Sequence, residues 1–258
     1  MTESLAEFSS GTALVFGGTG GLGAEICRAL AASGSNVVFT YHSKASAAQS
    51  LVKDIEGQGR KARAVPVQIE DPQSVQKAVS SAVAEFRTIH SVVYASGPPI
   101  EYLYINEIKN SEWTRIFNAD VNGCFNVVEA TLPHFRERKR GNYVAIITAA
   151  VDRAPPRDIL SAGPKAAIQM LFRGVAREEG RNGIRANCVG PGFIAAGLGL
   201  ATIHEHTKEY VDKMARAIPL KRPGQPSDIA NATIFLLSDK ASYITGVSIP
   251  VAGGLQIA

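Results

Sequence analysis

Short apolar runs rich in β-branched residues alternate with longer amphipathic stretches from one end of the chain to the other. Runs of this length and composition are typical of strands in a sheet that is covered on both faces. Because helical stretches separate them, the strands are expected to run parallel and to be joined by crossover helices. The predicted strands are Ala13–Phe16, Asn36–Thr40, Ala62–Pro66, Ser91–Ala95, Tyr143–Thr148, Arg185–Val189 and Val247–Val251.

The stretches between the strands have the length and apolar spacing of helices. Gly34 suits the left-handed position after the first helix, and Pro72 followed by Ser74 suits a helix entrance. The whole pattern predicts the α/β class: a single domain over residues 1–258, with a doubly wound parallel sheet of about seven strands. The predicted helices are Leu22–Ser33, Ala45–Gln58, Ser74–Phe86, Ser111–Phe135, Ser161–Glu179 and Ser227–Leu237.

Composition and charge agree with one enzyme-sized domain. The chain has 258 residues, of which 45% are hydrophobic and 19% charged, so it can bury the core of such a domain. The net charge of +4 is a small excess. Its densest cluster, at residues 136–140, stands near the end of a predicted helix, where cations are favourable. Neither a nucleic acid nor a membrane is therefore expected as a partner.

The cysteines indicate a reducing environment. Cys27, Cys124 and Cys188 are an odd number and lie in apolar segments, unlike the cysteines of a disulfide framework. The first ten residues hold two glutamates and no long apolar run, so they resemble neither a signal peptide nor a membrane anchor. We therefore expect reduced thiols and a cytoplasmic protein.

A glycine-rich turn follows the first predicted strand and opens the first predicted helix. Glycines allow a tight turn close to a diphosphate, and the free N–H groups at a helix N-terminus favour its negative charge. A purely structural turn remains an alternative, but the position between strand and helix favours dinucleotide binding. The residues expected to contact the diphosphate are Gly17, Thr19, Gly21, Leu22 and Gly23.

The end of the second predicted strand bears on the choice of cofactor. Tyr41 is followed by His42, Ser43 and Lys44, with no carboxylate to hold ribose hydroxyl groups. Donors of this kind can bind a 2′-phosphate, so NADP(H) is expected rather than NAD(H). The alternative is a solvated turn with Lys44 in water.

Several short motifs occur in a fixed order along nearly the whole chain: Gly17-x-x-x-Gly21-x-Gly23, Ala95-Ser96-Gly97, Asp120-Val121-Asn122-Gly123, Lys165, Pro191-Gly192, Ile244-Thr245-Gly246 and Gly253-Gly254. In this order and spacing they resemble the motifs of the short-chain dehydrogenase/reductase family. The resemblance implies a single Rossmann-type domain that transfers hydride between a nicotinamide and a carbonyl, alcohol or activated alkene, in a homotetramer or a homodimer. It also implies further cofactor contacts at Gln68, Ile69, Ala95, Ser96, Gly97, Lys165, Pro191, Gly192 and Ile194.

Members of the family commonly place a Ser, a Tyr and a Lys around the reacting carbon, with an Asn in a proton relay. The resemblance assigns these positions to Thr148, Ser161, Lys165 and Asn122. A tyrosine is a far stronger acid than a serine, and a nearby lysine brings its pKa closer to neutral. Ser161 therefore leaves the proton source open.

Three proton sources are candidates: water held between Ser161, Thr148 and Lys165; Tyr102 or Tyr104; and Asp158. Three further departures from the family are Ala196, where a Thr is frequent, Tyr94, where an Asn is frequent, and Gln68-Ile69, where an acidic residue near the adenine is frequent. The half of the site that binds the phosphates is thus closer to the family pattern than the reactive half.

The apolar stretch from 192 to 222 is expected to form a lid over a hydrophobic or acyl-type substrate. Within it, His204 and His206 lack further ligands nearby in the sequence, so no metal site is expected. An NADPH-dependent reductase of a carbonyl or conjugated enoyl group is the first hypothesis. A non-catalytic dinucleotide-binding protein and a non-redox lyase or isomerase remain open.

Overall fold

The computed structural model describes residue 8, residues 10–196 and residues 208–258. Seven parallel strands form one sheet in the order β3-β2-β1-β4-β5-β6-β7, which confirms the predicted doubly wound architecture. The strands are β1 (Thr12–Phe16), β2 (Asn36–Tyr41), β3 (Ala62–Pro66), β4 (Ile89–Tyr94), β5 (Gly141–Ile146), β6 (Ile184–Pro191) and β7 (Ser248–Val251).

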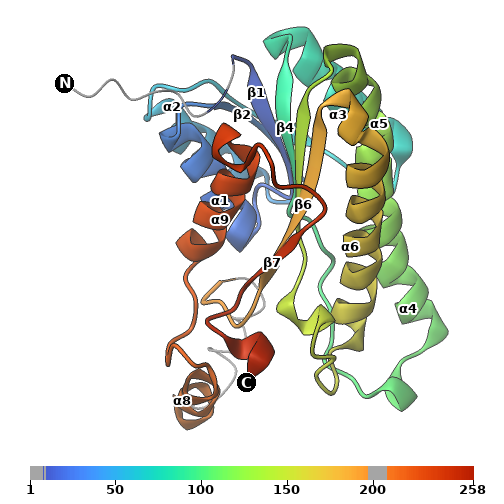
Figure 1. Ribbon diagram of the computed structural model, residues 1–258, viewed down its shortest axis with the longest axis vertical. Helices are drawn as coiled ribbons and strands as arrows, with labels where there is room; N and C mark the ends of the chain where they lie inside the picture. The colour runs from blue at the N-terminus through green and yellow to red at the C-terminus, as the bar shows by residue number, and fades with distance from the viewer. Residues whose placement is uncertain (1–7, 9, 197–207) are drawn as a thin grey trace.

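Helices cover both faces of the sheet (Figure 1). One face carries α1 (Gly21–Ala32), α2 (Ala45–Glu56) and α9 (Pro226–Leu237), and the other carries α3 (Pro72–Phe86), α5 (Gly123–Arg138) and α6 (Ile159–Glu179). Each layer has its own apolar core against the sheet. The five inner strands are therefore buried on both faces, as their continuous apolar runs predicted, whereas the outer strands β3 and β7 are partly exposed.

The carboxyl ends of the strands gather at one end of the molecule, where α8 (Lys208–Ala217) also lies (Figure 1). The segment expected to be a lid, 192–222, follows β6 at this end. Its residues 197–207, with His204 and His206, lie outside the described residues, so the lid and the pair of imidazoles stay predictions. No helix in the described ranges is long and apolar enough to cross a membrane.

The predicted helix over Ser111–Phe135 is confirmed, with one irregularity. The helical segment consists of α4 (Asn110–Phe117), a π-helical turn (Asn118–Asn122) and α5. A π turn places one extra residue in the helix and is frequent at functional sites. The extra residue changes the direction of every later side chain around the helix axis. The face on which a side chain of α5 lies can therefore not be predicted from the spacing in α4.

Candidate active and cofactor site

The glycine-rich turn between β1 and α1 is held tightly against the neighbouring strands. Gly18 N donates to Thr40 O at 2.9 Å, and Gly17, with φ of 86°, lies where a Cβ atom would be 2.6 Å from Ala95 O. A methyl group at Gly23 would overlap the carbonyl group of Gly17. The turn therefore requires glycine at Gly17 and Gly23, which leaves the backbone exposed to a ligand.

The first turn of α1 has the donors that a diphosphate requires. In the described part of the chain, the N–H groups of Thr19, Gly21, Leu22 and Gly23 have no acceptor, and Gly20 supplies no side-chain cap. No acidic residue lies in this turn. Free amides at a helix N-terminus without a competing carboxylate fit an anionic group.

The residues expected at the ribose and adenine lie along the ends of β2 and β3. His42, Ser43 and Lys44 are exposed after β2, and Lys44 immediately precedes α2. Gln68 is exposed and donates from Nε2 to Glu70 at 3.1 Å, whereas Ile69 packs against Gly123 at the start of α5. The side chain of Gln68 is therefore exposed at the surface, whereas that of Ile69 packs against the start of α5.

Predicted cofactor contacts also lie at the ends of β4 and β6. Ala95, Ser96 and Gly97 follow β4, and the carbonyl oxygen of Ser96 accepts from Lys165 Nζ at 3.2 Å. Pro191 ends β6, and Gly192 N donates to Val251 O at 3.1 Å. Ile194 is buried and bridges to Gly224. The structure thus places these residues at the carboxyl edge of the sheet.

Lys165 is the ionic centre of the reactive half. Its ammonium donates to Asp120 Oδ1 at 2.8 Å, and both side chains are largely buried, with 12% and 4% of their surface exposed. The ring of Tyr94 lies below the ammonium, 5.6 Å from Nζ to the ring centroid. Asp120 was not among the predicted site residues.

The expected role of Asn122 needs correction. Asn122 is exposed, and its Nδ2 donates to Asn118 Oδ1 at 2.9 Å, so its amide faces its own helix rather than Lys165. The π turn carries Asp120 inward instead. Because that turn changes the register, Asp120 takes the place near Lys165 that the resemblance gave to Asn122.

The two predicted hydroxyl residues come from different elements. Thr148 follows β5, and its Oγ1 accepts from Ala150 N at 3.1 Å, which leaves its own proton free to be donated. Ser161 lies one turn before Lys165 on α6 and is half-buried, so the two side chains share a helix face. In the described ranges, Ser161 Oγ makes no hydrogen bond.

The remaining candidates for the proton source lie on two loops: Asp158 between β5 and α6, and Tyr102 and Tyr104 between β4 and α4. Burial raises the pKa of Asp158 to about 6, and its carbonyl oxygen accepts from Ser161 N at 3.0 Å. Tyr102 and Tyr104 are exposed beside Arg157: the guanidinium lies 5.5 Å from the ring centroid of Tyr104, and Nε donates to Tyr102 O at 2.9 Å.

A mostly apolar cavity of about 500 Å³ opens beside this loop. Its size is that of a small-molecule site. The loop is strained, since Ala154 and Arg157 have φ of 45° and 67°, and such strain is common at ligand sites. The cavity is lined by Tyr104, Ile105, Asn106, Ala154, Pro155, Pro156, Arg157, Ile159 and Ala162. Ala162 directly follows Ser161 on α6, so the cavity lies beside the segment that carries Ser161, although Ser161, Thr148 and Lys165 do not line it.

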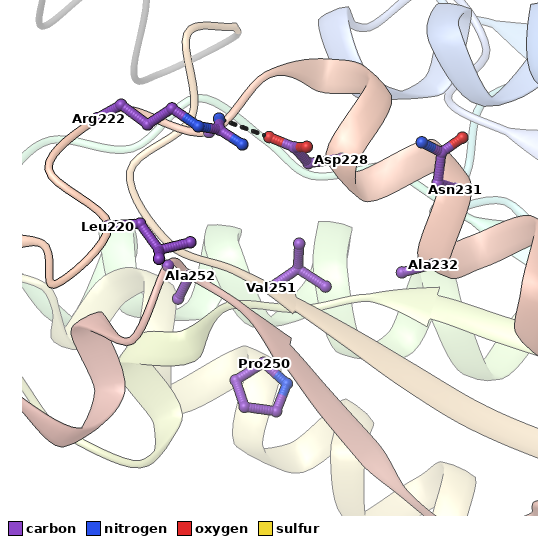
Figure 2. Close-up of a pocket in the computed structure, with 10 residues that line it drawn as sticks. Leu220, Arg222, Asp228, Asn231, Ala232, Pro250, Val251 and Ala252 are labelled. Atoms are coloured by element: carbon purple, nitrogen blue, oxygen red, sulfur yellow. Dashed lines mark hydrogen bonds and ion pairs between the residues drawn. The ribbon is translucent and has the colours of Figure 1, made fainter.

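A second cavity, of about 380 Å³, lies between the start of α9 and the end of β7 (Figure 2). Its lining residues Leu220 and Arg222 belong to the segment predicted as a lid, and none of its lining residues was among the predicted catalytic or cofactor-binding residues. Its charged groups pair with each other, with Arg222 Nη1 donating to Asp228 Oδ2 at 2.9 Å. Arg222 holds the pKa of the Asp228 carboxyl below its usual value, so this cavity has no free charge for catalysis.

Residues 17–256 match the family model described as enoyl-(acyl carrier protein) reductase. The 3-oxoacyl-(acyl-carrier-protein) reductase FabG of Staphylococcus epidermidis is 30% identical over 246 residues, 95% of this chain and 99% of that protein. The versicolorin reductase stcU of Emericella nidulans is 32% identical over 250 residues, 94% of each chain.

Two solved structures are similar to this chain over nearly its whole length. A short-chain type dehydrogenase/reductase from Mycobacterium ulcerans has a TM-score of 0.90 and 29% identity, with 97% of this chain and 91% of that chain covered. A gluconate 5-dehydrogenase from Burkholderia cenocepacia, in complex with NADP and tartrate, has a TM-score of 0.90 and 25% identity, with 99% of both chains covered.

Proposed function

The chain belongs to the short-chain dehydrogenase/reductase family of oxidoreductases, and on that basis we propose that it is an NADPH-dependent reductase of a carbonyl or conjugated enoyl group in a hydrophobic or acyl-type substrate. The observation that carries the proposal is Lys165, largely buried beside the carbonyl of Ser96 at the carboxyl edge of the sheet. Bound NADPH would supply the hydride. The protein must bind this cofactor, form the substrate pocket and supply a proton.

The cofactor would lie along the ends of the strands. The free amides of Gly21 and Leu22 would hold its diphosphate, and Lys165 would hold the nicotinamide ribose. Pro191, Gly192 and Ile194 would line the nicotinamide. The apolar cavity beside Pro155 and Ile159 supports a hydrophobic substrate.

Turnover tests the proposal. The protein is mixed with NADPH and a panel of ketones and enoyl thioesters, and cofactor absorbance is followed. Oxidation of NADPH that depends on one class of substrate would support the proposal and identify the group reduced. Tight NADPH binding without turnover on either class would contradict it in favour of a binding protein.

Lys44 is expected to select NADPH over NADH. A glutamate at this position would repel a 2′-phosphate, so Lys44→Glu should weaken NADPH binding by about 10- to 100-fold, roughly 1.4 to 2.7 kcal/mol, and leave NADH binding little changed. Titration of protein fluorescence with each cofactor measures this. Lys53→Glu, at the other end of α2, is the matched control. An equal loss of affinity for both cofactors would argue against a phosphate contact.

Asp158 is the proton source that the structure supports best, because burial raises its pKa to about 6 and it stands one turn before Ser161. If it donates its proton during reduction, kcat/KM should be highest below pH 6 and fall about tenfold per pH unit above it. Asp158→Asn should remove this dependence, whereas Tyr104→Phe should not. A pH profile that is the same in wild type and Asp158→Asn would exclude Asp158 as the donor.

Assembly into a homotetramer is proposed from exposed apolar side chains. Phe125 and Met170 are 51% and 62% exposed on α5 and α6, two helices of the same layer (Figure 1). Tyr243, in the segment that precedes β7, is fully exposed. Replacement of Phe125 and Met170 together by glutamate should reduce the mass in solution measured by light scattering to a half or a quarter. Lys77→Glu on α3 is the control. A wild-type protein that is already monomeric would refute the assembly.

A further inference from the structure

The ammonium of Lys165 has an anionic partner within the protein. Asp120 Oδ1 lies 2.8 Å from Nζ, and the carboxylate side chain is only 4% exposed. The neighbouring thiols do not compete for this role, because burial raises the pKa of Cys124 well above its usual value and that of Cys188 to about 12. Asp120 is therefore the counter-ion of Lys165 in the described part of the chain.

The backbone holds Asp120 in this position. The π turn leaves carbonyl groups displaced from the regular helical ladder, and the hydroxyl of Tyr94 donates to Asp120 O at 2.9 Å and lies 3.3 Å from Ala119 O. Tyr94 is 1% exposed, with its ring below Lys165 Nζ. One buried side chain thus supports both the turn and the ion pair.

This arrangement accounts for several departures from the family pattern together. A lysine beside a tyrosine stabilises the phenolate and lowers the pKa of the phenol. In this chain Ser161 replaces the tyrosine, and the ammonium of Lys165 pairs with the carboxylate of Asp120 instead. The charge of Lys165 is already balanced, so little of it remains to activate a further acid.

We propose that Asp120 is a positioning residue that replaces the tyrosine phenolate as the counter-ion of Lys165, so that Lys165 is fixed for the cofactor but no longer activates an acid. This rests on the proposed function only in placing a cofactor beside Lys165. The electrostatic part can be measured without cofactor or substrate. It predicts that a tyrosine restored at position 161 stays a weak acid unless Asp120 is neutralised.

The test compares Ser161→Tyr with Asp120→Asn/Ser161→Tyr, each against its parent with Ser161. The ultraviolet absorbance of phenolate is titrated, and the parent curve is subtracted to isolate the introduced phenol. In Ser161→Tyr we expect ionisation near pH 10 or above. In the double variant we expect it about one to three pH units lower, because Lys165 then has no carboxylate partner.

Activity provides a second measurement in the same proteins. With NADPH and ketones, the double variant should exceed Ser161→Tyr by about 100-fold at neutral pH, the usual contribution of a well-matched acid. Asp120→Glu/Ser161→Tyr keeps the charge and should behave like the single variant. If the introduced phenol ionises at the same pH with and without Asp120, the proposal is overturned, whether or not wild type turns over substrate.

If Asp120→Asn does not fold, a measurement on the wild-type protein still tests the pairing of Lys165 with Asp120. In protein labelled with a nitrogen isotope at lysine side chains, the ammonium of Lys165 should give a signal protected from solvent exchange, assigned by its loss in Lys165→Met. Absence of such a signal would overturn the pairing with Asp120.

Discussion

Replacement of Lys165 by methionine should abolish turnover and also destabilise the protein. Loss of the ammonium removes the contact proposed for the nicotinamide ribose, and we expect kcat/KM to fall by at least about 100-fold. It also leaves the carboxylate of Asp120, 4% exposed, without its cation. Breaking a buried pair in this way costs about 3 to 5 kcal/mol of unfolding free energy. Denaturant unfolding and NADPH oxidation measure the two effects.

The double variant Asp120→Asn/Lys165→Met separates these effects. With both charges removed, the unpaired carboxylate is gone, so most of the lost stability should return. Turnover should not return, because Lys165 is still missing. Recovery of turnover in the double variant would show that Lys165 acts only through stability, which would refute its place beside the cofactor.

Replacement of Gly23 by alanine should prevent cofactor binding. The added methyl group would overlap the carbonyl group of Gly17, with its carbon atom 2.9 Å away, so the backbone of the turn would have to move. Such a shift displaces the amides expected to hold the diphosphate. We expect affinity for NADPH to fall at least about 100-fold, or roughly 2.7 kcal/mol, with a loss of stability of about 1 to 3 kcal/mol.

Gly180→Ala is the matched control for this change. Gly180 has φ of −55° at the end of α6, and a Cβ atom there would have no neighbour within 4 Å. Its replacement should leave NADPH affinity unchanged. Unaltered NADPH affinity in Gly23→Ala would mean that the glycine-rich turn is purely structural.

The architecture could be predicted because the apolar pattern of strands buried on both faces differs from that of amphipathic helices. Element ends were less certain. The fifth strand was expected at Tyr143–Thr148 but is Gly141–Ile146. Gly141 and Asn142 have no apolar signal, yet they pair with Ile184 and Arg185 of β6. Pairing with a neighbouring strand, which a single segment does not reveal, decides such boundaries.

The site could be predicted where chemistry and helical spacing agree. Lys165 and Ser161, four residues apart, lie on one face of α6 as expected. Asp120 was missed because a π turn breaks the regular period, so the choice between Asp120 and Asn122 depends on a local change of register. One signal was available: Asp120 belongs to the same motif as Asn122, Asp120-Val121-Asn122-Gly123, so its carboxylate was a second polar candidate there. The structure buries this carboxylate, and a buried carboxylate needs a partner.

The remaining features of the site depend on which side chains are buried, and the sequence alone does not show this. Asp158 was one of three candidate donors, and the raised pKa that distinguishes it comes from the burial of its carboxyl group in the folded loop. The sequence did not predict Arg157 at the cavity. Its left-handed backbone conformation places the guanidinium beside the ring of Tyr104, and no sequence pattern predicts that conformation.

The central claim is that a nicotinamide dinucleotide lies along the carboxyl edge of the sheet, with its diphosphate at the start of α1 and its ring beside Lys165. Calorimetric titration of the wild-type protein with NADPH and with NADH tests this claim most directly. We predict saturable binding of about one NADPH per chain, weaker binding of NADH, and loss of both in Gly23→Ala. Absence of saturable binding of either cofactor to the folded wild-type protein would contradict it.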